Sequence, residues 1–300
     1  MQNYTWRAVQ ADDLGVLADL DAACRTADGP ASVPEPAYAA LLGAPATTLT
    51  CAVTADDTPV AVGWVQGQAA QARIGGRVHP QHRRRGLGNG MLRWAEAQAS
   101  SLGAPSRLII RNETLTDSSA ALYTQAGYQC DFAEHWLQRD LRGALPETAA
   151  PLPTVPWSAD SAPQFFAAYS AAFQTRPGFV APPAAEWISD NADDPEFRPD
   201  LSLVALAAGG PVGFVTAGVV PLPAGGPTVG WVSQIGVDPA WRGRGVATGL
   251  LAAVMAAFAH AGFSDLGLHV NANNANAIAL YTRLGFQPIG QRAKYSKALP

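Results

Sequence analysis

The sequence predicts an α/β protein of the α+β kind, made of two similar domains in tandem. One arrangement of strand, turn and helix occurs twice in its 300 residues, and a proline-rich stretch separates the two copies. In the clearer copy, Val229–Val237 reads as a strand, and apolar residues recur at helical spacing from Leu250 to Gly262. A turn rich in Gly and Arg joins them. The pattern therefore indicates a strand that passes directly into a long apolar helix.

The two copies keep the same spacing between their marker residues. Gly86 and Gly245 stand 159 residues apart, and Tyr123 and Tyr281 stand 158 apart. A repeat that keeps register over this length indicates an internal duplication. Each half is long enough to bury a core of its own.

The boundary between the halves is expected in a segment that contains four prolines. Such a composition favours an extended connector over a packed element. We therefore expect an N-terminal domain over residues 1–142, a linker over 143–156 and a C-terminal domain over 157–300.

Each half is expected to follow one order of elements, read from apolar periodicity and turn residues. In the first half we expect strands at 4–9, 48–53, 60–65, 71–78, 108–111 and 132–141, with helices starting at 12, at 36, after Gly90 and at 116. In the second half we expect helices starting at 162, near 187, at 249 and at 274, with strands at 201–206, 212–219, 229–237 and 266–270.

The turn before the apolar helix of the second half has the composition of an anion site. The first N–H groups of a helix lack intrahelical partners and carry partial positive charge. Gly243 and Gly245 have no Cβ that would keep a phosphate away, and Arg242 and Arg244 add charge. A diphosphate fits such a turn, although most short Gly/Arg turns only reverse the chain.

Two motifs in this order resemble the GNAT superfamily of N-acetyltransferases. The first is Val-x-Pro-x-x-Arg-x-x-Gly-x-Ala, from Val237 to Ala247. The second is Asn-x-x-Ala-x-x-x-Tyr-x-x-x-Gly-Phe, from Asn274 to Phe286. The resemblance covers both halves, and it implies in each a mixed, mostly antiparallel sheet flanked by helices. It also implies acetyl-CoA as acyl donor and a primary amine of a small molecule or peptide as acceptor, joined by direct attack in a ternary complex without a metal.

The resemblance implies a coenzyme site that is formed mainly by backbone groups. In the second half its residues would be Ile235, Gly236, Val237, Arg242, Gly243, Arg244, Gly245, Val246, Ala247, Thr248 and Asn274. In the first half the counterparts would be Arg83, Arg84, Arg85, Gly86 and Gly88. The strand at Ile235–Val237 is expected to bulge and to diverge from its parallel neighbour, which would leave an N–H for the thioester carbonyl. The alternative for the arginines of the first half is a solvated surface.

Tyr281 is the expected general acid, which would stabilise the departing thiolate. The alternative is a core residue, because Tyr281 shares an apolar helical face with Leu284. Many family members place a carboxylate on the central strand as base, whereas here that position is Trp231. His269 on the next strand has a suitable ordinary pKa, although a structural histidine is the alternative and water could serve.

The first half departs from the motif pattern. Thr116 stands where the family carries the Asn that the second half keeps as Asn274, and Gly75-Gly76 weakens the central strand. We therefore expect the chemistry in the second half, with the first half degenerate.

Two other functions stay open. Length and layout are similar to those of mycothiol synthase, a tandem family member that acetylates a cysteinyl amine, although Trp231 in place of the strand carboxylate argues against it. The other is a sensor or scaffold protein that binds acyl-CoA and catalyses no reaction.

Composition excludes several classes of protein. A net charge of −4 without a basic stripe argues against nucleic-acid binding. The three cysteines have no metal-ligand spacing, and no apolar stretch is long enough for a membrane span. We expect a cytoplasmic, bacterial-type enzyme without metal or membrane partner, as a monomer or homodimer.

Overall fold

The computed structural model divides the chain into two compact units, and each is described here by itself. The first comprises residues 1–135 and 289–300, and the second comprises residues 136–288. The structure describes residues 4–29, 37–68, 70–99, 101–102, 105–146, 152–176, 178–221 and 228–299. Parts of the predicted linker and of the turn after Pro221 lie outside these ranges.

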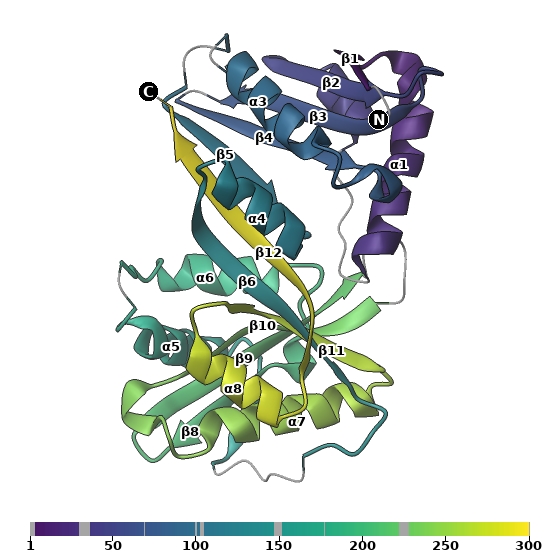
Figure 1. Ribbon diagram of the computed structural model, residues 1–300. Helices are drawn as coiled ribbons and strands as arrows, with labels where there is room; N and C mark the ends of the chain where they lie inside the picture. The colour runs from purple at the N-terminus through teal and green to yellow at the C-terminus, as the bar shows by residue number, and fades with distance from the viewer. Residues whose placement is uncertain are drawn as a thin grey trace. The chain divides into compact units, whose positions relative to one another are not determined.

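The first unit has a mixed sheet with helices on both faces (Figure 1). Its strand order is β1-β2-β3-β4-β5-β12-β6. The pairs β1–β2, β2–β3, β3–β4 and β5–β12 are antiparallel, and β4–β5 is parallel. The strands are β1 (Thr5–Ala8), β2 (Thr47–Val53), β3 (Pro59–Gln68), β4 (Gln71–Val78), β5 (Arg107–Asn112), β6 (Gln129–Asp140) and β12 (Gln287–Ala298). The helices are α1 (Leu14–Asp28), α2 (Tyr38–Leu42), α3 (Leu87–Ala99) and α4 (Asp117–Gln125).

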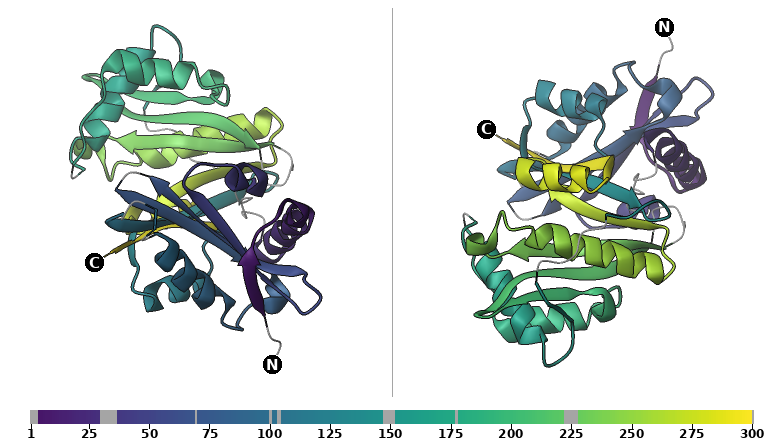
Figure 2. Two further views of the ribbon diagram at one scale, coloured as in Figure 1. Left: turned by 90° about the horizontal axis from the view of Figure 1, so that it is seen from above. Right: turned by 90° about the horizontal axis from the view of Figure 1, so that it is seen from below.

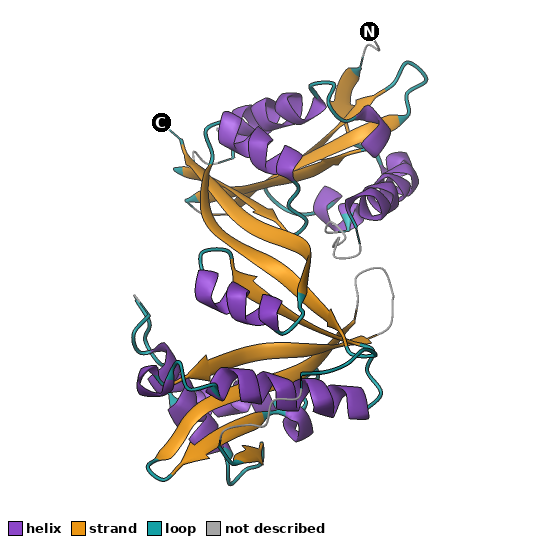
Figure 3. Ribbon diagram, turned by 60° about the horizontal axis from the view of Figure 1, so that its bottom comes forward, coloured by secondary structure: helices purple, strands orange, loops and turns teal. Residues whose placement is uncertain are grey.

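The second unit repeats this arrangement, again with helices on both faces of the strands (Figures 2 and 3). Its order is β6-β11-β10-β9-β8-β7, and β10 with β11 is the parallel pair. The strands are β7 (Thr154–Pro156), β8 (Leu203–Ala207), β9 (Gly210–Pro221), β10 (Thr228–Val237) and β11 (Asp265–Asn271). The helices are α5 (Ala162–Phe173), α6 (Ala184–Ala192), α7 (Val246–His260) and α8 (Ala275–Arg283).

The compact units differ from the sequence halves, because β6 and β12 each begin in one unit and end in the other. β12, for which we expected no element, pairs with β5 from Ala293↔Asn112 to Ala298↔Arg107. The strand expected at 132–141 is β6, and its residues 136–140 fall in the second compact unit. The last strand of each sequence half, β6 in the first and β12 in the second, is thus divided between the two compact units. Within the segment expected as the linker, residues 154–156 form β7.

The remaining elements lie close to the predicted ranges. Helix α7 shows why, because both its burial and its ends follow from residues that are adjacent in the chain. This helix is apolar on nearly all sides and is buried against β8, β9 and β10. It starts directly after Gly245, which has a left-handed φ of 80°, and it ends before Gly262, which has a φ of 87°. Gly262, at which the apolar pattern ends in the sequence, thus also follows the end of the helix, whereas the helix begins at Val246, before the first residue of the pattern.

The core of the second unit gives a stability prediction. Phe258 of α7 is fully buried, and its ring lies edge to face with Phe263 at a centroid distance of 5.2 Å. Phe258→Ala should lower the free energy of unfolding by about 3–5 kcal/mol, because it removes a buried ring and leaves a cavity. Chemical denaturation would measure it, with Val180→Ala as control because Val180 is 85% exposed. A loss below about 1 kcal/mol would show that this core is not packed as described.

Within the described ranges, no helix combines the length and the apolar character needed to cross a membrane.

Candidate functional site

The turn between β10 and α7 leaves a row of backbone donors open. Arg242 N donates to Pro239 O at 3.4 Å, and the next donor is Gly249 N, which bonds Gly245 O at 2.9 Å. Across the described chain, the N–H groups of residues 243–248 between them donate to no protein acceptor. Gly243 adopts a left-handed φ of 74°, and with Gly245 it turns successive N–H groups toward one side. The turn can therefore hold an anion at a helix start.

The first unit has a turn of the same backbone shape before α3. Gly86 has a φ of 85° and Arg84 has a φ of 62°, at the positions that match Gly245 and Gly243. A left-handed arginine costs about 1 kcal/mol or more relative to glycine. The shape of this turn is thus kept although one of its glycines is not.

One arginine in each turn braces the turn itself. Arg242 Nε donates to Val237 O at 3.2 Å, and its Nη2 donates to Ala172 O at 2.9 Å. Arg83 makes the matching bond to Val78 O at 3.1 Å and pairs with both carboxylate oxygens of Asp28 at 2.6 and 2.9 Å. That pair raises the pKa of Arg83. These two arginines thus hold the turn to the first helix of their unit.

Strands β10 and β11 diverge just before the turn. Their parallel pairing runs from Gly230↔Leu266 to Val232↔Leu268. The register of β10 against β9 shifts between Val232 and Gln234, which marks a β-bulge. Residues 235–237 follow, beyond the last residue pair of β10 with β11 and still paired with β9. The bulge lies slightly earlier than the stretch for which we expected it, and the divergence covers that stretch.

Strands β4 and β5 of the first unit also diverge, and a cavity of about 1080 Å³ lies there. Their parallel pairing ends at Ile74↔Ile110, and no register shift interrupts β4 against β3. The lining comes from the turn and α3, from the ends of β4 and β5, from α4, and from the end of α1. It includes Arg84, Gly86, Gly88, Asn89, Gly76, Arg77, Arg111, Asn112, Tyr123, Cys24 and Asp28. The cavity therefore reaches from the phosphate-type turn to the helix on the other face of the sheet.

The two candidate acid tyrosines have different surroundings. Tyr281 is 6% exposed, belongs to the α7 core and lies edge to face with Phe286 at 5.8 Å. Burial raises its pKa to about 12. Tyr123 is half-buried and its hydroxyl accepts a hydrogen bond from Asn112 Nδ2 at 2.9 Å. The ring of Tyr281 is therefore part of the core, which is the alternative given above for this residue.

His269 lies in a cluster of three aromatic rings. Its ring centroid is 4.9 Å from that of Trp231 and 5.5 Å from that of Trp136, and both contacts are edge to face. Leu268 lies in the α7 core, so His269 faces the opposite side of the sheet. Gly236 faces that side too, since a Cβ there would lie 2.6 Å from Ala172 of α5. His269 is thus on the side of the sheet opposite to α7.

Asn274 caps α8, where its side chain accepts from Ala277 N at 3.2 Å. Thr116 caps α4 in the same way. The substitution that we took as a departure of the first half therefore keeps the helix cap.

Sequence reasoning missed the hydrogen bond between Asn112 and Tyr123, the Arg83–Asp28 pair and the ring cluster. The sequence contains a signal for the role of Asn112, because Asn112 and Asn271 occupy matching positions in the repeat. The side chain of each accepts a hydrogen bond from the backbone N–H two residues later in the chain. The other two join residues far apart in the chain, and no local pattern shows them.

Two family models match the chain. An acetyltransferase (GNAT) family model matches residues 154–286, and an acetyltransferase (GNAT) domain model matches residues 48–130. Together they cover the turn and the divergent strands of both units.

Relatives and solved structures agree with these models. A mycothiol acetyltransferase of a Nocardioides species is 32% identical over 92% of this chain and 94% of its own length. One of Kineococcus radiotolerans is 32% identical over 73% of this chain and 70% of its own. A GCN5-related N-acetyltransferase structure from Sphaerobacter thermophilus has a TM-score of 0.66 at 25% identity and covers 98% of this chain and 95% of its own. A tandem GNAT protein from the clavulanic acid biosynthesis pathway has a TM-score of 0.58 at 20% identity and covers 99% of this chain and 98% of its own. This likeness supports the fold only.

Proposed function

Because the chain belongs to the GNAT family of acetyltransferases, we propose that its second unit transfers the acetyl group of acetyl-CoA to a primary amine. The transfer would be a direct attack of the amine on the thioester while both substrates are bound. The chain would be a soluble cytoplasmic monomer or homodimer, and the halves 1–142 and 157–300 would be the units that were duplicated.

The open donors at residues 243–248, next to the divergence of β10 from β11, carry this proposal. The diphosphate would accept hydrogen bonds from these N–H groups, with Arg244 beside it and Arg242 bracing the turn. The pantetheine arm would then enter between the diverging strands. An N–H of Ile235–Val237 would bond the thioester oxygen, whose charge increases during attack, and such a donor contributes about 3–4 kcal/mol in other oxyanion sites. The turn at Arg84, Arg85 and Gly86 would hold a coenzyme in the first unit in the same way.

His269 would take the proton of the attacking amine, since the central strand offers Trp231 in place of a carboxylate. An amine attacks only when neutral, and a positioned base of this kind contributes about 10²–10⁴-fold. His269→Gln should therefore lower kcat at pH 7 by at least tenfold, with a smaller effect as pH approaches the pKa of the amine. Trp136→Phe, which keeps an aromatic ring in the cluster, is the matched control. An effect of His269→Gln that is the same at every pH would contradict the base role.

Tyr281 would donate to the leaving sulfur, and its pKa predicts the alkaline side of the pH profile. A donor acts only while protonated, and with a pKa raised to about 12 Tyr281 is protonated at every pH below that value. We expect kcat to show no descending limb between pH 7 and 10. A descending limb near pH 9 in the wild-type protein, absent from Tyr281→Phe, would contradict this assignment.

The acceptor can be found by measuring coenzyme release from acetyl-CoA across a panel of primary amines. We expect release only when an acceptor amine is present, with initial-rate lines that intersect as a ternary complex requires. A protein that binds acetyl-CoA tightly but releases no coenzyme with any amine would be a sensor and not an enzyme.

The second candidate acceptor is a cysteinyl amine, the group that mycothiol synthase acetylates. The relatives of that name support it, at 32% identity over most of both chains. Trp231 argues against it, at the position where the family carries a carboxylate. Assay of the desacetyl precursor of mycothiol decides, because absence of acetylated product would dismiss this candidate and leave the general proposal intact.

A further inference from the structure

The first helix of each unit carries different side chains where it approaches the end of the central strand. The buried residues of the two helices keep the same spacing, with Leu17, Leu20 and Cys24 in α1 and Phe165, Ala168 and Ala172 in α5. In this register, three charged residues of α1 match two aromatic residues and one arginine of α5. The matched pairs are Asp21 with Tyr169, Arg25 with Phe173, and Asp28 with Arg176.

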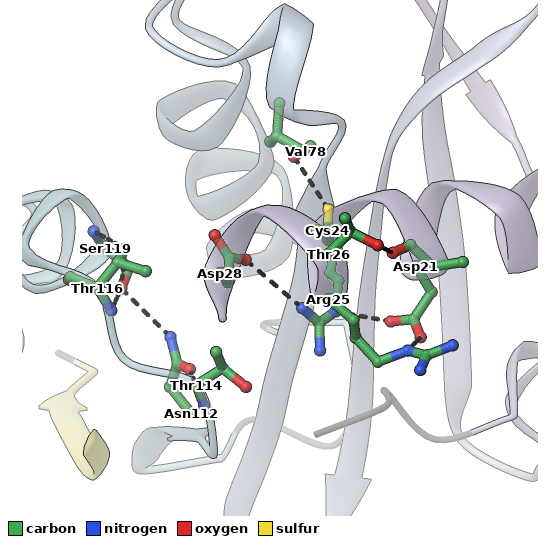
Figure 4. A network of polar contacts seen from close by, with 12 residues as sticks. Asp21, Cys24, Arg25, Thr26, Asp28, Val78, Asn112, Thr114, Thr116 and Ser119 are labelled. Atoms are coloured by element: carbon green, nitrogen blue, oxygen red, sulfur yellow. Dashed lines mark hydrogen bonds and ion pairs between the residues drawn. The ribbon is translucent and has the colours of Figure 1, made fainter. Parts of the chain in front are cut away.

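The charged residues of α1 form ion pairs within the first unit. Asp21 pairs with Arg25 at 3.1 Å, and Asp28 pairs with Arg83 at 2.6 Å. Arg77 of β4 also lies 2.8 Å from Asp21. Figure 4 shows Asp21, Arg25 and Asp28 together at this end of the helix. These side chains therefore bind one another and their neighbours within the protein.

The corresponding side of the second unit is aromatic, and it begins at the expected acyl end. Gly236 matches Arg77 in the repeat, and a Cβ on it would lie 3.6 Å from Cε2 of Phe173. The ring centroid of Phe173 lies 5.2 Å from that of Tyr169 and 6.0 Å from that of Phe179. All three rings are half-buried, so each keeps accessible surface. We call these three residues the aromatic patch.

The rings of the aromatic patch have the geometry of aromatic side chains that pack together. Tyr169 meets Phe173 at an interplanar angle of 62° and Phe179 at 70°, which are edge-to-face contacts. The guanidinium of Arg176 lies 4.8 Å from the centroid of the Phe173 ring and covers one of its faces. A further aromatic ring gains edge-to-face contacts here in addition to the area that it buries. The patch therefore suits an aromatic ring better than a polar group.

The other flank of the acyl end is aromatic as well. The rings of His269, Trp231 and Trp136 contact one another there, on the same side of the sheet as Gly236. Trp231 stands where the family carries a carboxylate, so this position contributes an apolar ring in place of a charge. Apolar rings thus flank the acyl end on both sides, with one titratable group, His269, among them.

We propose that the acceptor of the second unit is an arylalkylamine, a primary amine joined through a short carbon chain to an aromatic ring. Its nitrogen lies at His269, and its ring packs against the aromatic patch. This inference rests on the proposed function, because it names the substrate class of the same site. It is tested by binding in the presence of coenzyme A, which has no acetyl group to transfer. Its failure is therefore distinct from failure of the transferase proposal, which coenzyme release tests.

The test is calorimetric titration of phenethylamine and of ethylamine into the protein saturated with coenzyme A. The two amines share the amino group and differ only by the ring. We expect phenethylamine to bind at least about tenfold more tightly, because its ring is removed from water against the patch. Equal affinities, or no binding of either amine, would overturn the inference. The transferase proposal would still stand if another class of amine released coenzyme from acetyl-CoA.

Two variants show whether the aromatic patch holds the ring. Phe173→Ala and Phe179→Ala should each weaken phenethylamine binding at least about fivefold and leave acetyl-CoA affinity within about twofold. Val180→Ala is the matched control, because Val180 follows Phe179 in the same loop and is 85% exposed. Thermal melting checks the fold, and Phe179→Ala decides alone if Phe173→Ala unfolds. Wild-type affinity for phenethylamine in Phe179→Ala would overturn the inference.

Discussion

Thr248→Glu should reduce acetyl transfer by at least about 100-fold through loss of acetyl-CoA affinity. Thr248 is the third residue of α7, within the row of open N–H groups. A carboxylate there would compete with the diphosphate for these donors and would repel it. At 4 Å and an effective dielectric constant of 20, one such repulsion costs about 4 kcal/mol, which exceeds two orders of magnitude in affinity.

This substitution is chosen because it should leave the helix intact. A glutamate in the first turn interacts favourably with the helix dipole, whereas a side chain on Gly245 would be strained by its left-handed backbone. Thr248→Gln is the matched control, with the same shape and no charge, and should lose less than fivefold. Coenzyme release at subsaturating acetyl-CoA measures both. Equal losses in the two variants would mean that bulk and not charge is responsible.

Tyr281→Phe should lower kcat at least tenfold while acetyl-CoA affinity stays within about twofold. The substitution removes only the hydroxyl, and the ring keeps its place in the α7 core and its contact with Phe286. The loss would fall on the step in which the thiolate departs. Steady-state kinetics gives kcat, and calorimetric titration gives the affinity.

Tyr123→Phe is the corresponding change in the first unit. It removes the acceptor of the bond from Asn112, so it tests whether a tyrosine hydroxyl in that unit affects turnover. Because the chemistry is placed in the second unit, we expect kcat of Tyr123→Phe to stay near the wild-type value. Unchanged kcat in Tyr281→Phe would remove the acid role and leave that tyrosine as a core residue.

Local signals in the sequence predicted most of the fold. Apolar periodicity predicted α7 up to Gly262, with a start three residues later than the observed Val246, and the matched spacing in both halves revealed the duplication. The phosphate-type turn was predictable for the same reason, since its shape depends on residues adjacent in the chain. In the structure both Gly243 and Gly245 have left-handed φ angles, of 74° and 80°.

The features that sequence reasoning missed depend on pairing between distant segments. β12 contains Lys, Arg and Gln and lacks a continuous apolar run, so its place beside β5 comes from the sheet and not from its own propensity. The pair of Asp28 with Arg83 joins residues 55 positions apart. The charged neighbours of Arg77 and the apolar neighbours of Gly236, at matching positions of the repeat, also come from distant segments and became visible only in the structure.

The central claim is that the second unit carries the chemistry, and one matched pair of variants tests it most directly. Asn89 of α3 corresponds to Thr248 of α7, so Asn89→Glu and Thr248→Glu place the same charge in the two turns. Both are compared with the wild-type protein in coenzyme release with a single acceptor amine. The account predicts wild-type turnover within about twofold for Asn89→Glu and almost none for Thr248→Glu. The reverse result would place the chemistry in the first unit and contradict the account.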